Sequence, residues 1–218
     1  MDFTAIDFET STSGYTSACS LGWCIVRNSK VVERKEILIK PEPFEFNEHN
    51  IRINGITPDM VYDKPTFDMY WDRLRPDIEN QMIVAHNARF DMGVLCRTLE
   101  HYGIEIPVCD YLCTVVLSQK AYPELESHKL NKLCEALNIK FNHHRAYDDA
   151  YACAAAFLRI AEDYSLETFE EIEECFDVKR THVYPGCDIG KKKTAKKRVS
   201  KAKKDKSTDR KQTTVKDF

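Results

Sequence analysis

The stretch FTAIDFET, residues 3–10, decides how the rest of the chain is organised. Its apolar residues predict a strand buried in a sheet. Successive side chains of a strand alternate between its two faces, so Asp7 and Glu9 project together. Ile6 and Phe8 then point the other way, into the core. Two carboxylates at the end of a buried strand repel each other unless a cation neutralises them, and a hard divalent ion is a suitable partner. Taken alone, Asp7 and Glu9 are better explained as solvent-exposed acids at the end of a strand.

A second candidate acid, Asp91, follows the apolar stretch IVA and precedes MGVL, residues 92–95. We expect a strand before it and a helix after it, with Asp91 in the first turn of that helix. Ligand sites in α/β proteins gather at the carboxyl ends of strands. An acid that favours the helix dipole also explains Asp91 well. That alternative does not explain the polar residues His86 and Asn87 beside it.

The stretch HRAYDDA, residues 144–150, supplies a third group of polar side chains. Asp149 begins a predicted helix rich in alanine, and small residues let such a helix lie close to the first strand. His144 lies in the preceding loop, and a loop histidine suits a general base near pH 7. His143 and Asp148 have the same five-residue spacing, so the residues alone leave the pairing open. The alternative to a catalytic role is that His144 is a surface histidine and Asp149 an acid at the start of a helix.

The remaining pattern is a strand hairpin followed by strands that alternate with helices. LGWCIVRN and KVVERKEILIK predict two antiparallel strands, joined by a tight turn at Asn28 and Ser29. Further along, we expect a strand at residues 81–87, helices at 67–74, 90–102, 129–137, 147–161 and 166–175, and either a strand or a helix at 111–121. This order predicts an α/β sandwich with a mixed sheet.

Length and composition narrow the class of protein. A chain of 218 residues suits one domain with a full core. No apolar stretch approaches the roughly 18 residues that a membrane span needs. The first residues carry no basic run, so we expect no secretory signal and a cytoplasmic protein. The nine cysteines form no C-x-x-C pair, which favours reduced core thiols over zinc ligands or disulfides.

The net charge of −3 conceals an uneven distribution of charge. Residues 186–218 contain 13 Lys and Arg against 4 Asp and Glu, whereas residues 1–185 contain 19 against 31. An acidic body with a basic tail fits a protein that handles polyanions. The tail is too poor in apolar residues to order itself, so we expect a folded domain at 1–185 and a disordered Lys-rich tail at 186–218. Its basic run either attracts phosphates in a salt-dependent way or only keeps the protein soluble.

Together, the stretches DFET, HNARFD and HRAYDDA resemble the three motifs of the DEDDh group of DnaQ-like 3′–5′ exonucleases. That group includes the proofreading epsilon subunit of bacterial DNA polymerase III and several ribonucleases. The resemblance covers about residues 1–163, with the motifs in order. It implies a ribonuclease H-like fold, with a five-stranded mixed sheet flanked by helices. It also selects His144 with Asp149, because an alanine follows the ligand aspartate in the pattern H-R-A-x-x-D-A.

The resemblance also implies roles for single residues. The implied ligands of two Mg²⁺ or Mn²⁺ ions are Asp7, Glu9, Asp91 and Asp149. The implied nucleotide-binding residues are Thr10, near the terminal nucleotide, Asn87, at the strand-to-helix turn, and Phe90, in the nucleotide pocket. His144, with Glu9 as the other catalytic residue, would deprotonate the attacking water. Two ions would stabilise the attacking and leaving oxygens. The expected product is a nucleoside 5′-monophosphate, released from the 3′ end of single-stranded DNA in proofreading or repair.

The last residues, QTTVKDF, resemble the short peptides that dock into sliding clamps. Gln212, Val215 and Phe218 would be the anchoring residues of such a peptide, which would order on binding. A polymerase is another partner that the tail could recruit.

Two alternatives to a DNA exonuclease follow from the same residues. The first is an exoribonuclease that trims RNA 3′ ends, because tolerance of a 2′-hydroxyl depends on loop geometry. The second, from another class, is a non-catalytic replication adaptor that recruits partners through its tail. The intact set of acids argues against the adaptor.

Overall fold

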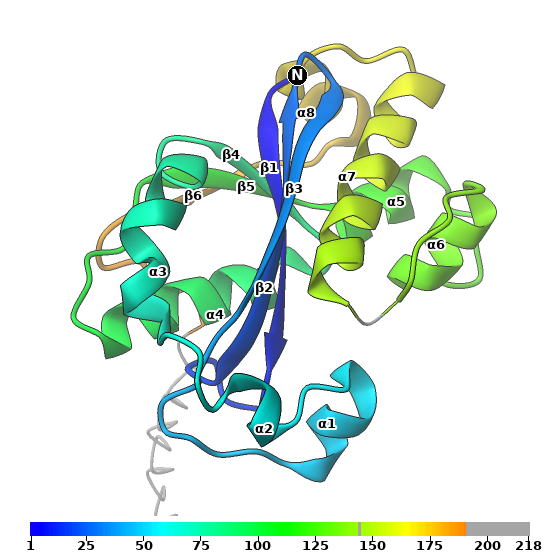
Figure 1. Ribbon diagram of the computed structural model, residues 1–218. Coiled ribbons are helices and arrows are strands. Elements are labelled where there is room, and N and C mark those ends of the chain that lie inside the picture. Colours follow the sequence, from blue (N-terminus) through cyan, green and yellow to red (C-terminus); the bar gives the residue numbers. More distant parts are fainter. Residues whose placement is uncertain (144, 191–218) are drawn as a thin grey trace, which may run out of the picture.

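The computed structural model describes residues 1–143 and 145–190, and a mixed sheet forms the centre of this part of the chain (Figure 1). Its six strands are β1 (Phe3–Thr10), β2 (Ala18–Arg27), β3 (Lys30–Leu38), β4 (Met82–Ala85), β5 (Cys109–Cys113) and β6 (Thr181–Val183). They lie side by side in the order β3-β2-β1-β4-β5-β6. β4 runs parallel to β1 and β5, and the other neighbours are antiparallel. The mixed sheet is therefore confirmed, with one strand more than the five expected.

Helices cover both faces of the sheet (Figure 1). They are α1 (Glu48–Asn54), α2 (Pro58–Val61), α3 (Phe67–Leu74), α4 (Ala88–His101), α5 (Thr114–Ala121), α6 (Leu130–Ala136), α7 (Ala146–Asp163) and α8 (Phe169–Phe176), with a 3-10 turn at Arg75–Asp77. On one face, α3 and α4 pack on Ile6 and Phe8 of β1. On the other face, α5, α7 and α8 pack on Phe3 and Ala5. The alternation predicted for β1 is thus confirmed, and it places Asp7 and Glu9 on the α7 face.

The hairpin at the start of the chain also has the predicted geometry. Asn28 and Ser29, between β2 and β3, both have left-handed backbone angles, with φ of 49° and 57°. Two such residues in succession are typical of the tight turns whose twist matches paired antiparallel strands. Strands β1, β2 and β3 therefore form one continuous antiparallel unit, on which α7 lies.

The first turn of α7 approaches β2 unusually closely, and Gly22 permits this approach. A Cβ atom at Gly22 would lie 1.9 Å from the backbone oxygen of Ala146. Because that oxygen belongs to the main chain, no rotation of a side chain could relieve the contact. Gly22 therefore sets the distance between α7 and the sheet.

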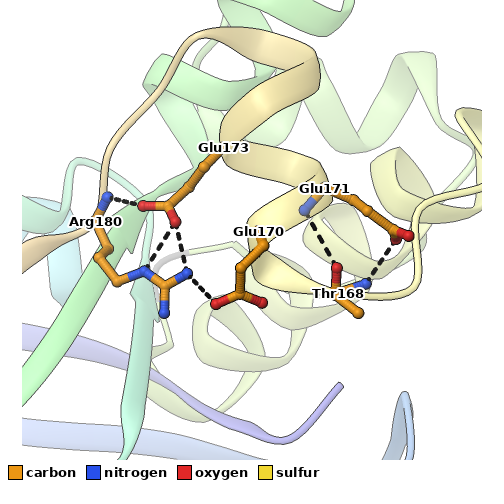
Figure 2. Close-up of polar contacts among 5 residues, drawn as sticks. All are labelled: Thr168, Glu170, Glu171, Glu173 and Arg180. Carbon is orange, nitrogen blue, oxygen red and sulfur yellow. Dashed lines mark hydrogen bonds and ion pairs between the residues drawn. The ribbon is translucent and has the colours of Figure 1, made fainter.

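The far end of the sheet is joined to α8 by a group of charged contacts (Figure 2). Thr168 and Glu171 form a capping box, in which each side chain accepts a hydrogen bond from the other's backbone N–H. Arg180 donates from its backbone and its guanidinium to Glu173 and also reaches Glu170, at 2.7 Å. These bonds link α8 to the segment that leads into β6.

Two short elements were missing from the sequence prediction. Helix α1 lies in a segment for which no helix was expected, although its caps are visible in the sequence. Asn47 accepts a hydrogen bond from the backbone of Asn50, and Gly55 ends the helix in a left-handed conformation. Strand β6 is only three residues long and follows no alternating pattern. The ambiguous stretch 111–121 contains both elements, the end of β5 and then α5.

The packed part of the chain reaches beyond the expected domain limit of residue 185. Cys187 and Ile189 are buried in the core on the α4 side, and Gly190 lies against Gly93. The rest of the predicted tail, residues 191–218, lies outside the described residues. Seven of the nine cysteines are buried, in line with the predicted core thiols, whereas Cys113 is partly buried and Cys175 is exposed. No helix in the described ranges has the length and apolar character needed to cross a membrane.

The close approach at Gly22 leads to a prediction about stability. We expect Gly22→Ala to lower the free energy of unfolding by about 1–3 kcal/mol, because α7 must move away from β2 to admit the methyl group. Urea denaturation measures this loss. Gly14→Ala is the matched control, since its Cβ would meet Thr12 Oγ1 at 3.3 Å and little else. Equal stability of the two variants would contradict the account of α7 docking.

Candidate active site

Three carboxylates meet beside the central strand. Asp7 and Glu9 project from one face of β1, and Asp149 projects from the first turn of α7. One oxygen atom from each of them lies within 4.8 Å of the other two. Oxygen atoms gathered in this way suit a hard divalent cation. The fold therefore brings together three of the four predicted metal ligands, from segments about 140 residues apart.

The fourth acid, Asp91, lies in the first turn of α4, as predicted. Its carboxylate accepts a hydrogen bond from the backbone N–H of Phe8, at 3.0 Å. Phe8 stands between Asp7 and Glu9 in β1, so this bond fixes Asp91 against the same strand. Asp91 is 2% exposed, and its charge acts on Asp7.

The electrostatics of this group disfavour full ionisation of its acids. Burial, followed by the charges of Asp91, Asp149 and Glu9, holds the pKa of Asp7 well above its usual value. Burial raises the pKa of Glu9 to about 7, although a hydrogen bond from Asn54 opposes the shift. Burial also raises the pKa of Asp91 to about 8. Four acids cannot all ionise here without neutralising charge, so the donor set fits divalent metal ions.

Asp148 and Asp149 are adjacent in the sequence, but they have different surroundings. Asp149 is 4% exposed and belongs to the carboxylate group. Asp148 forms an ion pair with Arg34 of β3, at 2.7 Å, and is 3.4 Å from Asn142. The geometry therefore separates the two aspartates that sequence spacing alone left open.

Arg34 fastens the start of α7 to the edge of the sheet. Its guanidinium carbon lies 4.2 Å from the ring centre of Tyr147 and 4.2 Å from that of Tyr151, so it is held between two aromatic rings as well as by Asp148. Because Asp149 follows Asp148 in the same helical turn, these contacts also hold the turn that carries Asp149.

Of the two candidate histidines, only His143 is among the described residues. His144 lies outside the described residues. His143 is described, and its Nδ1 atom is 3.0 Å from a carboxylate oxygen of Asp149. A third histidine, His86, contacts Thr114 through Nδ1 at 2.9 Å, and burial lowers its pKa to about 4. His86 is therefore a neutral ring at ordinary pH.

A cavity of about 830 Å³ lies over the carboxylates. The predicted nucleotide-binding residues Asn87 and Phe90 line it, with Asn87 in a left-handed conformation at the turn between β4 and α4. Thr10 is not among the described residues that line the cavity. Its side chain is buried, and its hydroxyl accepts a hydrogen bond from Asn50 at 3.1 Å.

Sequence reasoning did not single out one part of the cavity lining. It comprises Gln119 and residues 126–131, around the start of α6. The only sequence signal is the polar run ESHK before a predicted helix, a pattern common on protein surfaces. The predicted clamp-binding residues Gln212, Val215 and Phe218 lie outside the described residues.

Comparison with known proteins places this site in a family. The family model described as Exonuclease matches residues 4–157. A PolC-type DNA polymerase III from Bacillus cereus is 28% identical over 179 residues, which are 80% of this chain and 12% of that protein. Its counterpart from Halalkalibacterium halodurans is 32% identical over 169 residues, 74% of this chain and 11% of that protein. The chain thus spans about an eighth of the length of these curated relatives.

Solved structures share the fold. Exonuclease X in complex with 5′ overhanging duplex DNA has a TM-score of 0.62 and 24% identity, and the match covers 80% of this chain and all but 1% of that one. A 3′-exonuclease described as recognising the 3′ end of a histone mRNA stem-loop has a TM-score of 0.63 and 15% identity, covering 86% and 92%. These matches confirm the expected ribonuclease H-like architecture. With a family model that matches most of its length, the chain belongs to the exonuclease family, as its three motifs predicted.

Proposed function

We propose that the protein is a metal-dependent 3′–5′ exonuclease that releases nucleoside 5′-monophosphates from single-stranded DNA. The observation that carries this proposal is the meeting of Asp7, Glu9 and Asp149 under a cavity, with Asp91 fixed beside them. Such a group suits phosphodiester cleavage, in which charge develops on both the attacking and the leaving oxygen. Membership of the exonuclease family supports the same reaction.

The four acids would hold two Mg²⁺ or Mn²⁺ ions. When bound, such ions supply the positive charge that stabilises the attacking and leaving oxygens of an in-line displacement. His144 would take the proton of the attacking water, and Glu9 would help to orient that water. Asn87 and Phe90 would receive the terminal nucleotide in the cavity. Thr10 would act indirectly, through the hydrogen bond that it accepts from Asn50.

DNA is the substrate that we favour, because the curated relatives are DNA polymerases. RNA is the alternative, since one solved structure of similar fold recognises the end of an mRNA stem-loop. We also propose a polymerase or a sliding clamp as partner, reached through the basic tail at 186–218 and its last residues. A cytoplasmic location accords with nine free thiols. A purely non-catalytic adaptor would have no need of four converging acids.

The first test is a timed digest of single-stranded DNA and RNA labelled at the 5′ end, with Mn²⁺. We expect a ladder that shortens from the 3′ end of one substrate. Asp149→Asn should lower the rate at least about 100-fold, because it removes a charge from the metal-binding group. Asp148→Asn, the neighbouring control, should lose less than about tenfold, because Asp148 acts only through the position of α7. No cleavage of either substrate by the unmodified protein would refute the proposal.

The second test separates the two histidines. We expect His144→Ala to lower turnover about 10²- to 10⁴-fold, the usual contribution of a general base, while Mn²⁺ binding measured by calorimetry persists. His143→Ala should reduce turnover less, since its described contact is with the ligand Asp149. A larger loss of turnover in His143→Ala than in His144→Ala would reverse the assignment.

The third test uses the raised pKa values of the acids. Between about pH 4 and pH 8 the folded protein retains protons that the unfolded chain has released, so metal-free stability should fall as pH rises. The shift of Glu9, from 4.5 to about 7, corresponds to a loss on the order of 3 kcal/mol. Mn²⁺ should reduce this loss, because it replaces the protons. Urea denaturation at pH 5, 6, 7 and 8, with EDTA or Mn²⁺, measures how steeply the free energy of unfolding changes with pH in each condition. A metal-free slope that does not flatten in Asp7→Asn would contradict the explanation.

A further inference from the structure

A second group of residues lines the cavity, apart from the carboxylates and the nucleotide-binding residues. It comes from the loop between α5 and α6 and from the start of α6, and we call it the loop wall. Its members are Glu126, Ser127, His128, Lys129, Leu130 and Asn131. The proposed chemistry uses none of them. Their polar side chains nevertheless face a cavity of about 830 Å³, near the upper end of the range of about 300–1,000 Å³ for ligand sites.

Lys129 is an unpaired cation in an acidic setting. It is exposed, and its Nζ atom forms no ion pair with any residue in the described ranges. Lys132, one turn further along, differs in this respect, because its Nζ lies 2.8 Å from Glu135. Residues 1–185 carry 12 more acids than bases, and the cavity lining includes the four candidate metal ligands and Glu126. A free ammonium group on this lining provides attraction for a polyanion that the rest of the cavity repels.

His128 is held in a fixed orientation. Its Nδ1 atom is 3.1 Å from the hydroxyl oxygen of Ser118, and that hydroxyl donates its hydrogen to the backbone oxygen of Val115 at 3.0 Å. The oxygen of Ser118 therefore accepts a hydrogen bond from Nδ1–H. The second ring nitrogen, Nε2, has no hydrogen-bond partner within the described part of the chain, and His128 lines the cavity. A histidine ring that is held through one nitrogen, with its other nitrogen available, is suited to binding a ligand.

We propose that His128 and Lys129 bind the sugar–phosphate backbone of the substrate strand, on the 5′ side of the bond that is cleaved. This inference rests on the proposed function, which puts the scissile phosphate at the carboxylates and the terminal nucleotide beside Phe90. The loop wall is then the part of the same cavity that remains for the retained strand. Backbone contacts of this kind hold a polynucleotide without reading its sequence. The loop wall would thus distinguish a strand from a single nucleotide ester.

Binding to a labelled oligonucleotide tests the role of Lys129 without turnover. Fluorescence anisotropy of single-stranded DNA is measured with the full chain in EDTA, at several salt concentrations. We expect Lys129→Gln to weaken binding about three- to tenfold and to reduce the slope of log K against log salt by about 0.7. Lys132→Gln is the matched control and should match the unmodified protein. Equal affinity and slope for Lys129→Gln and Lys132→Gln would overturn the proposal.

His128 requires a test that separates ligand binding from support of the loop. His128→Asn retains an amide that can meet Ser118 but removes the group at Nε2. We expect this variant to raise KM for the oligonucleotide about tenfold, with kcat little changed. Hydrolysis of the p-nitrophenyl ester of thymidine 5′-monophosphate, which has no upstream strand, should stay the same. A variant that behaves like the unmodified protein on both substrates, or loses both activities equally, would overturn the role.

Different results would contradict the proposed exonuclease activity and the loop-wall inference. If the unmodified protein cleaves neither substrate with Mn²⁺, the proposed exonuclease activity is wrong, and anisotropy still decides whether the loop wall binds a strand. If cleavage occurs but neither Lys129→Gln nor His128→Asn changes strand binding or KM, the loop-wall inference alone is wrong. Thermal unfolding of each variant confirms that a change in binding does not come from loss of the fold.

Discussion

The gathering of four carboxylates at one site, two of them buried and two partly buried, is the constraint on which the rest of this structure depends. Asp7, Glu9, Asp91 and Asp149 come from a central strand and from the first turns of two helices. Burial, reinforced by the neighbouring negative charges, raises the pKa of Asp7, Glu9 and Asp91 above their usual values. A flexible chain would separate these charges. They stay together because the sheet and its helices pack around them with apolar side chains on both faces. The core therefore supplies the energy that holds an unfavourable group of charges in place, and a bound cation would stabilise that group.

Two contacts transmit this constraint to the helix that carries Asp149. Gly22 lets the main chain of α7 lie directly on β2, and Arg34 holds the neighbouring Asp148 at the sheet edge. The paired aspartates thus have separate functions in one helical turn: Asp148 anchors the turn to a cation of the protein, while Asp149 presents its charge to the cavity. Replacing either contact would leave the acids in the sequence but would weaken the hold on the first turn of α7, which carries Asp149.

The fold and the acids were largely predictable because they depend on local patterns. Alternation in FTAIDFET placed Asp7 and Glu9 on one face, and the polar stretches before α4 and α7 marked the other acids. Elements of three to seven residues, such as β6 and α1, give too short a signal and are fixed by tertiary pairing and capping. Spacing alone did not separate Asp148 from Asp149; the resemblance to the exonuclease motifs selected Asp149, whereas the contact of Asp148 with Arg34, 114 residues away, could not be predicted. The loop wall could not be predicted either, because nothing in ESHK shows which cavity it will face.

The charges of the site also determine how a substrate can approach it. A nucleic-acid strand is a polyanion, and the cavity floor is acidic, as is the body of the protein as a whole. Without cations, the attraction available to the strand within the described residues of the cavity comes from Lys129 and from hydrogen bonds such as that offered by His128. Under the proposed function, metal ions would have two effects: they would neutralise the floor and attract the scissile phosphate to it. Because both effects would act on the same strand, binding of metal and binding of substrate would be thermodynamically linked, each strengthening the other by the same factor. The acidic site would consequently favour the strand most when its metal ions are already in place.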